Sequence, residues 1–322
     1  MSFTVVSTFS GCGGSSLGYK LAGGKILLAA DFDKHAVNTY KANFPNTPLF
    51  HGDVTNLEVE KILEITGLKA GELDIFDGSP PCQGFSTTGK RDMGDNRNQL
   101  FKQFCRILEG LKPKVFVMEN VSGMVKGNMK FVFVEILKTL KACGYKVNAK
   151  LLNAKNFNVP QSRQRMIFIG VREDLNIEPS HPSGSTKLIT LRECLKDCPD
   201  GERLKPRGFP AEVVHKIKPG ETAANYHPKG SYFSYQRLTW DRPSPTITKK
   251  CDLGMFFHPD LNESLSIEEV KRISSFPDDF IFTGPFREQW ARMGNCVPPN
   301  FMKAIAEHIR DNILLKTKGE SC

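Results

Sequence analysis

The sequence predicts an α/β protein with an open, mostly parallel sheet, and three observations predict it. An apolar run at residues 4–9 leads into a glycine-rich turn and then a helix towards Leu21. Two further short runs, at 25–30 and 48–52, end in acidic residues. Two more apolar runs, at 73–76 and 115–118, have the length of buried strands. Helical patterns at 34–44, 98–111 and 129–143 alternate with these strands, as in α/β folds.

The composition changes at about Arg172. The runs at 145–153 and 165–171 read as a strand pair, and beyond them the chain is rich in Pro, Gly, Lys and His. We therefore predict a large domain formed by residues 1–175 and 264–322, with helices at 266–274 and from 300 to about 315. Residues 176–263 would form a second, smaller domain. Its basic, aromatic-containing surface suits nucleic acid, although a solvated loop surface fits nearly as well.

Overall composition limits the classes of function. The chain has 322 residues, 39% hydrophobic and 25% charged, and a net charge of +9 that suits an anionic partner. Nine scattered cysteines, with Cys194 and Cys198 the only close pair, indicate reduced thiols and neither a disulfide framework nor a metal site. The chain enters its first strand at once, and its apolar runs are too short to span a bilayer. We therefore expect an intracellular, membrane-free protein.

One cysteine stands where a strand ends and a polar, glycine-containing loop begins. Cys82 follows Pro80-Pro81, which stiffen the backbone before it, and the loop runs on to Asn96. In open α/β sheets, ligands bind at the carboxyl ends of strands. A buried structural thiol is the alternative, since free cysteines are usually small core residues. The rigid prolines on one side and the flexible loop on the other favour a reactive thiol.

The glycine turn after the first strand resembles a nucleotide-binding layout without its full spacing. Ser16 stands where the third glycine of G-x-G-x-x-G would be, which disfavours a pyrophosphate cofactor. A smaller adenosine ligand fits better, with Asp31 as the acceptor for ribose hydroxyls and Phe32 covering the adenine. A tight turn with no ligand is the alternative for this element alone, and a helix cap is the alternative for each acidic residue.

A carboxylate and two arginines are the remaining candidates for site residues. Glu119 follows the apolar strand at 115–118, where a carboxylate is unfavourable unless it is paired or used; its alternative role is to cap the next turn. Arg163 and Arg165 lie two apart in an extended segment and point to the same side. They suit recognition of an anion or a base, with a solvated charged edge as the alternative.

Six ordered blocks together resemble the DNA (cytosine-5)-methyltransferases. The resemblance covers nearly the whole chain in the family's order and leaves out only about 175–235. The blocks are Phe9-Ser10-Gly11-Cys12-Gly13-Gly14, Pro80-Pro81-Cys82-Gln83, Glu119-Asn120-Val121, Gln161-Ser162-Arg163-Gln164-Arg165, Arg237-Leu238-Thr239-Trp240 with Pro243-Ser244-Pro245-Thr246-Ile247, and Gly294-Asn295-Cys296-Val297-Pro298.

The resemblance implies a Rossmann-like domain that binds S-adenosyl-L-methionine and releases S-adenosyl-L-homocysteine. Asp31 would bind the ribose, Phe32 would stack on adenine, and Asp53 would accept from its amino group. Within the glycine loop we expect Cys12 to serve packing. The remaining residues implied for the cofactor are Phe9, Ser10, Gly11, Gly13, Gly14, Val54, Pro80, Leu100, Asn295 and Val297.

The same resemblance implies the chemistry and the partner. Cys82 would add to C6 of a cytosine that has been flipped out of duplex DNA, and Glu119 would donate to N3. Arg165 would hold O2, and Arg163 would lie between the thiolate and a phosphate. The small domain would recognise the target. The implied DNA contacts are Gln83, Ser86, Thr88, Lys90, Arg91, Gln161, Arg237 and Thr246.

Three other functions stay open at this point. A tRNA cytosine-5 methyltransferase is disfavoured because no Cys-Phe-Thr element is found, and a flavin or nicotinamide oxidoreductase because no Cys-x-x-Cys pair is found. A catalytically inactive DNA-binding module is opposed by the intact Cys82, Glu119 and Arg165. We expect a monomer inside the cell, in the cytoplasm or nucleoid if the source organism is a prokaryote. The sequence does not determine the target site, the base that removes the C5 proton, or whether a cognate restriction endonuclease acts separately alongside it.

Overall fold

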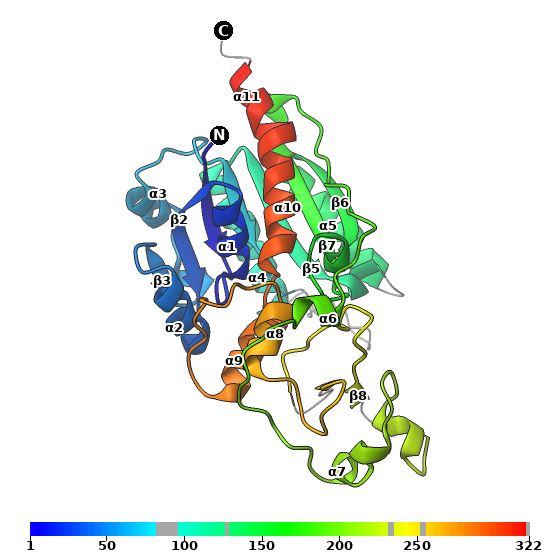
Figure 1. Cartoon of the computed structure of the whole chain (residues 1–322). Coiled ribbons are helices and arrows are strands. Elements are labelled where there is room, and N and C mark those ends of the chain that lie inside the picture. The colour runs from blue at the N-terminus through cyan, green and yellow to red at the C-terminus, as the bar shows by residue number, and fades with distance from the viewer. Residues whose placement is uncertain (82–95, 126–128, 231–234, 252–255, 320–322) are drawn as a thin grey trace. The chain divides into compact units, whose positions relative to one another are not determined.

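The computed structural model describes residues 1–81, 96–125, 129–230, 235–251 and 256–319. These residues form two compact units (Figure 1). The first consists of Met1–Asn153, Gln164–Ser183 and Met302–Cys322, and the second of Ala154–Arg163 and Gly184–Phe301. Residues 264–301, expected in the large domain, thus belong to the second unit, and 154–163 join them there. The functional domain boundaries stay a prediction.

The first unit is built on a seven-stranded sheet with strand order β3-β2-β1-β4-β5-β7-β6. Strands β1 to β5 are parallel, and β7 pairs antiparallel with both β5 and β6. The strands are β1 (Phe3–Thr8), β2 (Gly24–Asp31), β3 (Leu49–His51), β4 (Ile75–Gly78), β5 (Val115–Val121), β6 (Tyr145–Asn153) and β7 (Gln164–Arg172). The predicted α/β class and the predicted strand pair are confirmed.

Helices connect the parallel strands and cover the sheet. On one face, α3, α4 and α5 share a hydrophobic core with the strands, centred on Phe76, Phe104 and Phe116. Phe76 stacks on Phe104, with ring centroids 4.7 Å apart. Helix α3 was not predicted. The helices of this unit are α1 (Gly14–Leu21), α2 (Lys34–Asn43), α3 (Val59–Thr66), α4 (Asn96–Leu111), α5 (Met129–Ala142) and, from its C-terminal segment, α11 (Leu315–Gly319).

The order of the strands creates a switch point between β1 and β4. From β1 the chain runs outward to β2 and β3 on one side and later to β4 and β5 on the other. The loops after β1 and β4 therefore leave the same edge of the sheet in opposite directions. Ligands of open α/β sheets bind at such a point. The fold thus brings together the starts of the glycine loop and of the segment that leads to Cys82.

The second unit has short elements and a core of its own. Trp290, Ile273 and Leu265 belong to its larger hydrophobic cluster. Helix α9 was not predicted; its buried Phe286, Trp290 and Met293 follow helical spacing. Its elements are α6 (Leu191–Cys194), α7 (Phe209–Val213), β8 (Gln236–Arg237), β9 (Phe256–Phe257), α8 (Ile267–Ile273) and α9 (Phe286–Asn295); α10 (Pro299–Ile309) begins here and continues into the first unit. None of the helices in the described ranges is both long and apolar enough to cross a membrane.

Candidate active site of a methyltransferase

The glycine loop joins β1 to α1 through three residues with positive φ. Phe9, Gly11 and Gly13 have φ values of 54°, 56° and 95°. A Cβ on Gly13 would lie 2.5 Å from Cε2 of Phe44, so only glycine fits there, whereas a Cβ on Gly11 would meet no atom of the described residues within 4 Å. Gly13 thus allows the first turn of α1 to pack closely, and Gly11 faces open space into which a ligand could approach the backbone.

Asp31, at the end of β2, is hydrogen-bonded to the glycine loop. Its Oδ2 accepts from the backbone N–H of Gly11 at 2.7 Å, and its Oδ1 accepts from that of Asp33 at 2.9 Å. The next residue, Phe32, has 72% of its side chain exposed. A large exposed aromatic ring beside a carboxylate at a strand end suits an adenosine, because the ring can stack on the base. The open space at Gly11 and the exposed ring therefore fit an adenosine cofactor.

Of the other residues expected at the cofactor site of this unit, Asp53 is exposed, Leu100 is partly buried, and Val54, Cys12 and Ser10 are buried. Asp53 caps the turn η1 (Val54–Asn56) by accepting from the N–H of Thr55 at 2.8 Å. Val54 and Cys12 are 7% and 1% exposed, and Leu100 packs against the core. Ser10 donates from its hydroxyl to the carbonyl of Ala30 at 3.2 Å, which links the loop to β2.

A side chain from β5 holds the backbone that leads to Cys82. The side-chain amide of Asn120 donates to the carbonyl of Pro80 at 2.9 Å, and Asn120 is 6% exposed. Pro80 is buried as well. Asn120 therefore fixes the chain two residues before the cysteine. Cys82 itself lies outside the described residues, as do Gln83, Ser86, Thr88, Lys90 and Arg91.

Glu119 and Arg165 form an ion pair across β5 and β7. In the antiparallel register Glu119 lies opposite Ile167 and Val121 lies opposite Arg165, so the two charged side chains are diagonal neighbours on one face of the sheet. The Arg165 Nε and a Glu119 carboxylate oxygen are 2.7 Å apart, and the side chains are 14% and 12% exposed. The pair sets the direction of a carboxylate at the edge where β4 and β5 end.

In the second unit, Arg163 and Gln161 join three of the sequence blocks. Arg163, 3% exposed, donates to the carbonyls of Ile247 and Gly294 at 3.1 and 3.0 Å. Gln161, 1% exposed, accepts from the N–H of Ile247 at 3.2 Å. Thr246 donates from its hydroxyl to the carbonyl of Ser162 at 2.7 Å. These bonds give Arg163, Gln161 and Thr246 a structural role within the unit, and their expected parts in catalysis and DNA contact stay predictions.

The block around Asn295 ends α9 by close backbone packing. A Cβ on Gly294 would lie 2.2 Å from the carbonyl oxygen of Thr248, so the two backbones approach as only glycine permits. Asn295 is exposed, and Val297 is 6% exposed. Their expected contact with the cofactor stays a prediction.

Arg237, an expected DNA contact, is bonded inside the second unit. It is 5% exposed and makes five hydrogen bonds, to the carbonyls of Ile217, Val214, His258 and Leu261 and to Asn262. A guanidinium has five N–H groups, so all of them are used inside the unit. These bonds give Arg237 a structural role in holding the loop before α8, and its expected contact with DNA stays a prediction.

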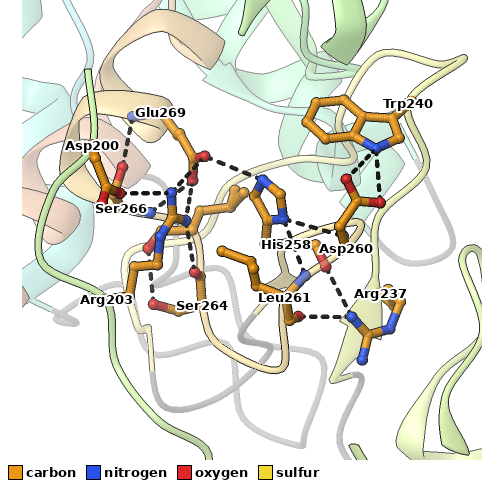
Figure 2. Close-up of polar contacts among 11 residues, drawn as sticks. Asp200, Arg203, Arg237, Trp240, His258, Asp260, Leu261, Ser264, Ser266 and Glu269 are labelled. Atoms are coloured by element: carbon orange, nitrogen blue, oxygen red, sulfur yellow. Dashed lines mark hydrogen bonds and ion pairs between the residues drawn. The ribbon is translucent and has the colours of Figure 1, made fainter. Parts of the chain in front are cut away.

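The same loop is held by a second buried group (Figure 2). Arg203 binds both carboxylate oxygens of Glu269, at 2.6 and 2.9 Å, and Glu269 also lies 3.4 Å from the His258 Nε2. The other ring nitrogen of His258 accepts from the backbone N–H groups of Asp260 and Leu261. Burial lowers the pKa of His258, in keeping with a neutral ring. We call Arg203, His258 and Glu269 the buried triad.

Comparison with known proteins gives the same assignment as the site. The family model of the C-5 cytosine-specific DNA methylases matches residues 3–311. The chain belongs to this family. Among its relatives, the type II methyltransferase M1.HphI of Haemophilus parahaemolyticus is 36% identical, with 96% of this chain and 87% of that protein covered. M.NgoPII of Neisseria gonorrhoeae is 34% identical, with 96% of both chains covered.

Solved structures share the fold of this DNA methylase. A DNA modification methyltransferase candidate encoded within an Escherichia coli prophage has a TM-score of 0.80 at 24% identity, with 97% and 99% of the chains covered. A variant of Spodoptera frugiperda DNMT2 has a TM-score of 0.69 at 22% identity, covering 96% of this chain and 98% of that one. The predicted family, enzyme class and fold are confirmed.

Sequence reasoning missed several residues of this DNA methylase. Asn120 lay within a quoted block but was given no role. Asp77 is buried near the end of β4. Like Glu119, it is an acidic residue at the end of an apolar strand, so the same argument could have identified it from the sequence. The buried triad had no signal in the sequence, because its members are far apart in the chain. Cys194 and Cys198 are half-buried, and desolvation raises the pKa of their thiols to about 12 and about 11, which disfavours a reactive pair.

Proposed function

We propose that this C5 cytosine DNA methyltransferase transfers the methyl group of S-adenosylmethionine to C5 of a cytosine flipped out of duplex DNA, through a covalent bond between Cys82 and C6. The observation that carries the proposal is the Glu119–Arg165 ion pair beside the switch point between β1 and β4. From the same edge of the sheet start the glycine loop, with its open face at Gly11, and the segment that leads to Cys82.

Cys82, Glu119 and Arg165 have separate roles in the proposed reaction. The Cys82 thiolate adds to C6 of cytosine, and Glu119, which must be protonated or share its proton with the base at this step, donates that proton to N3, so that C5 gains the electron density of an enamine. Arg165 keeps the Glu119 carboxyl in place and donates to O2 of the ring. When bound, S-adenosylmethionine supplies an electrophilic methyl group on a positively charged sulfur. Once C5 carries the methyl, N3 returns its proton to Glu119, a base takes the C5 proton, and the electron pair of that C–H bond forms the C5–C6 double bond and expels the Cys82 thiolate.

The cofactor would be held by the first unit. Asp31 would accept from the ribose hydroxyls, and Phe32 would stack on the adenine. Gly11 would let the methionine part approach the backbone. We propose that Asp53 accepts from the adenine amino group. Double-stranded DNA is the expected substrate, and we assign its target recognition to residues 176–263, whose exposed lysines suit phosphates.

Covalent trapping tests the proposal. Duplex DNA containing 5-fluorocytosine, incubated with enzyme and S-adenosylmethionine, should form an adduct that survives denaturing gels, because fluorine cannot leave as a proton does. Cys82→Ala should form none and should lose methyl transfer, while its affinity for the cofactor stays near that of the wild type. Cys143→Ala removes a half-buried thiol elsewhere on the first unit and should keep the adduct. An adduct in Cys82→Ala, or methylation of tRNA in place of duplex DNA, would refute the proposal.

A further inference from the structure

Asp77 is a buried carboxylate that the chemistry above does not use. It belongs to β4, five residues before Cys82, and is 2% exposed. Its Oδ2 accepts from the hydroxyl of Ser7 at 2.8 Å, and its Oδ1 accepts from the hydroxyl of Tyr19 at 3.1 Å. Both partners are themselves fully buried. A buried carboxylate is unfavourable unless it is hydrogen-bonded, and a hydrophobic side chain at this position would cost less free energy. The presence of Asp77 therefore suggests a role beyond packing.

The two partners lie on either side of the glycine loop. Ser7 is near the end of β1, before the loop, and Tyr19 is on α1, after it. Asp77 thus connects both ends of the loop to the strand that leads to the cysteine. The next element is held in the same way, since the Tyr40 hydroxyl of α2 donates to Ser16 on α1 at 3.0 Å. The first turns of α1 are therefore fixed by buried hydroxyl groups on two sides.

The described segment that follows Asp77 is also fixed. After Asp77 come Gly78, where a Cβ would lie 2.7 Å from Oγ1 of Thr8, and Pro80, whose carbonyl accepts from Asn120. The path from Asp77 to the edge of the described segment thus has little freedom. A displacement of Asp77 would move the glycine loop and the backbone before Cys82 together.

Charged and titratable groups face Asp77 from three elements. Tyr19 is on α1, Tyr40 on α2 and Glu119 on β5. Burial raises the pKa of Asp77 to about 7; the hydrogen bonds from Ser7 and Tyr19 oppose this shift, and the charge on Glu119 adds a smaller effect in the raising direction. Ionised Asp77 accepts both bonds at full strength, because hydrogen bonds to a charged acceptor are about twice as strong as neutral ones.

We propose that Asp77 is a positioning residue that, through Ser7 and Tyr19, ties the glycine loop to β4, the strand that leads to Cys82. The inference rests on the proposed function, in which the glycine loop holds S-adenosylmethionine and Cys82 attacks the base. Asp77 would touch neither the cofactor nor the base, but it would align the glycine loop with the segment that leads to Cys82.

Calorimetric titration with S-adenosylmethionine, without DNA, tests the inference in Asp77→Asn. At pH 8 the affinity should fall about tenfold, the effect of one lost hydrogen bond to a charged group. At pH 6, where wild-type Asp77 is mostly protonated, the two proteins should differ much less. Tyr19→Phe and Ser7→Ala should each weaken binding at pH 8 in the same direction, and single-turnover methyl transfer at saturating cofactor should slow as well.

Two matched controls separate positioning from stability. Asp74→Asn changes a buried carboxyl of the same strand region, which accepts from Thr4 and Lys114, and Tyr145→Phe removes a buried hydroxyl that donates to Pro113. Both should lower the melting temperature and leave the cofactor affinity and its dependence on pH unchanged.

The outcomes are distinct. If Asp77→Asn and Tyr19→Phe melt earlier but bind the cofactor like the controls, the inference is wrong and Asp77 is structural only. If Asp77→Asn does not fold, Tyr19→Phe decides in the same way. A folded wild type that binds no S-adenosylmethionine would overturn the proposed function, and the inference with it.

Discussion

Replacing Glu269 by Gln should strongly destabilise the second unit. The carboxylate binds Arg203 through two hydrogen bonds of 2.6 and 2.9 Å, and the side chains of Arg203 and Glu269 are only 11% and 6% exposed. The other carboxylate near Arg203, that of Asp200, is 92% exposed and 3.4 Å away. Removing one partner of a buried ion pair leaves the other uncompensated and costs about 3–5 kcal/mol.

The assay uses the two tryptophans of the chain. Trp240 and Trp290 both belong to the second unit, so their fluorescence reports on its unfolding alone. With a urea m value of about 1–3 kcal/mol/M for a unit of this size, the midpoint should fall by at least about 1 M. As a control, Asp278→Asn breaks an ion pair with Arg272 in which the aspartate is 52% exposed, and it should cost less than about 1 kcal/mol.

A double variant tests whether the unpaired buried charge of Arg203 causes the loss of stability. Replacing Arg203 and Glu269 together by Met removes both charges, so no buried charge is left unpaired and much of the stability should return. The reasoning would be refuted by a Glu269→Gln midpoint equal to that of the wild type. It would also be refuted by a double variant as unstable as the sum of the two single ones.

Three further predictions concern the first unit. Glu119→Gln should slow methyl transfer by about 10²-fold or more, because an amide cannot donate a proton to N3; wild-type rates in a radiolabel assay would remove that role. Gly11→Ala should lose about 1 kcal/mol of stability because of its positive φ, and it should bind S-adenosylmethionine much more weakly. Gly13→Ala should lose more stability, because its Cβ would clash with Phe44. Urea unfolding measures the stabilities, and calorimetric titration measures the affinities. Burial lowers the pKa of His181 to about 4, so the neutral ring stabilises the fold above pH 6.5 and this contribution is lost as the pH falls from there through about 4; a ring-proton NMR midpoint near 6.5 would contradict this.

Local pattern was enough to predict most elements of the first unit. Short apolar runs, glycines and prolines mark strands and turns within a few residues of the chain, which is why β1, β2, β4 and β5 and the strand pair were found. Helices α3 and α9 were missed. Helix α9 contains Gly294, and a glycine usually counts against a helix. The reason for a glycine at this position is its close approach to Thr248, which only the tertiary structure shows.

The sequence by itself determined the α/β class and the family, since each depends on residue type and order along the chain, and it supplied the candidate site residues, whose roles stay predictions. The tertiary structure alone decided which groups are partners. The register of β5 and β7 brings Glu119 to Arg165, and the fold of the second unit directs the buried Arg237 to backbone carbonyls. The strand order places Ser7 and Tyr19 around Asp77. Such pairings join residues tens of positions apart, and their energy depends on register and loss of solvent, which local pattern does not contain.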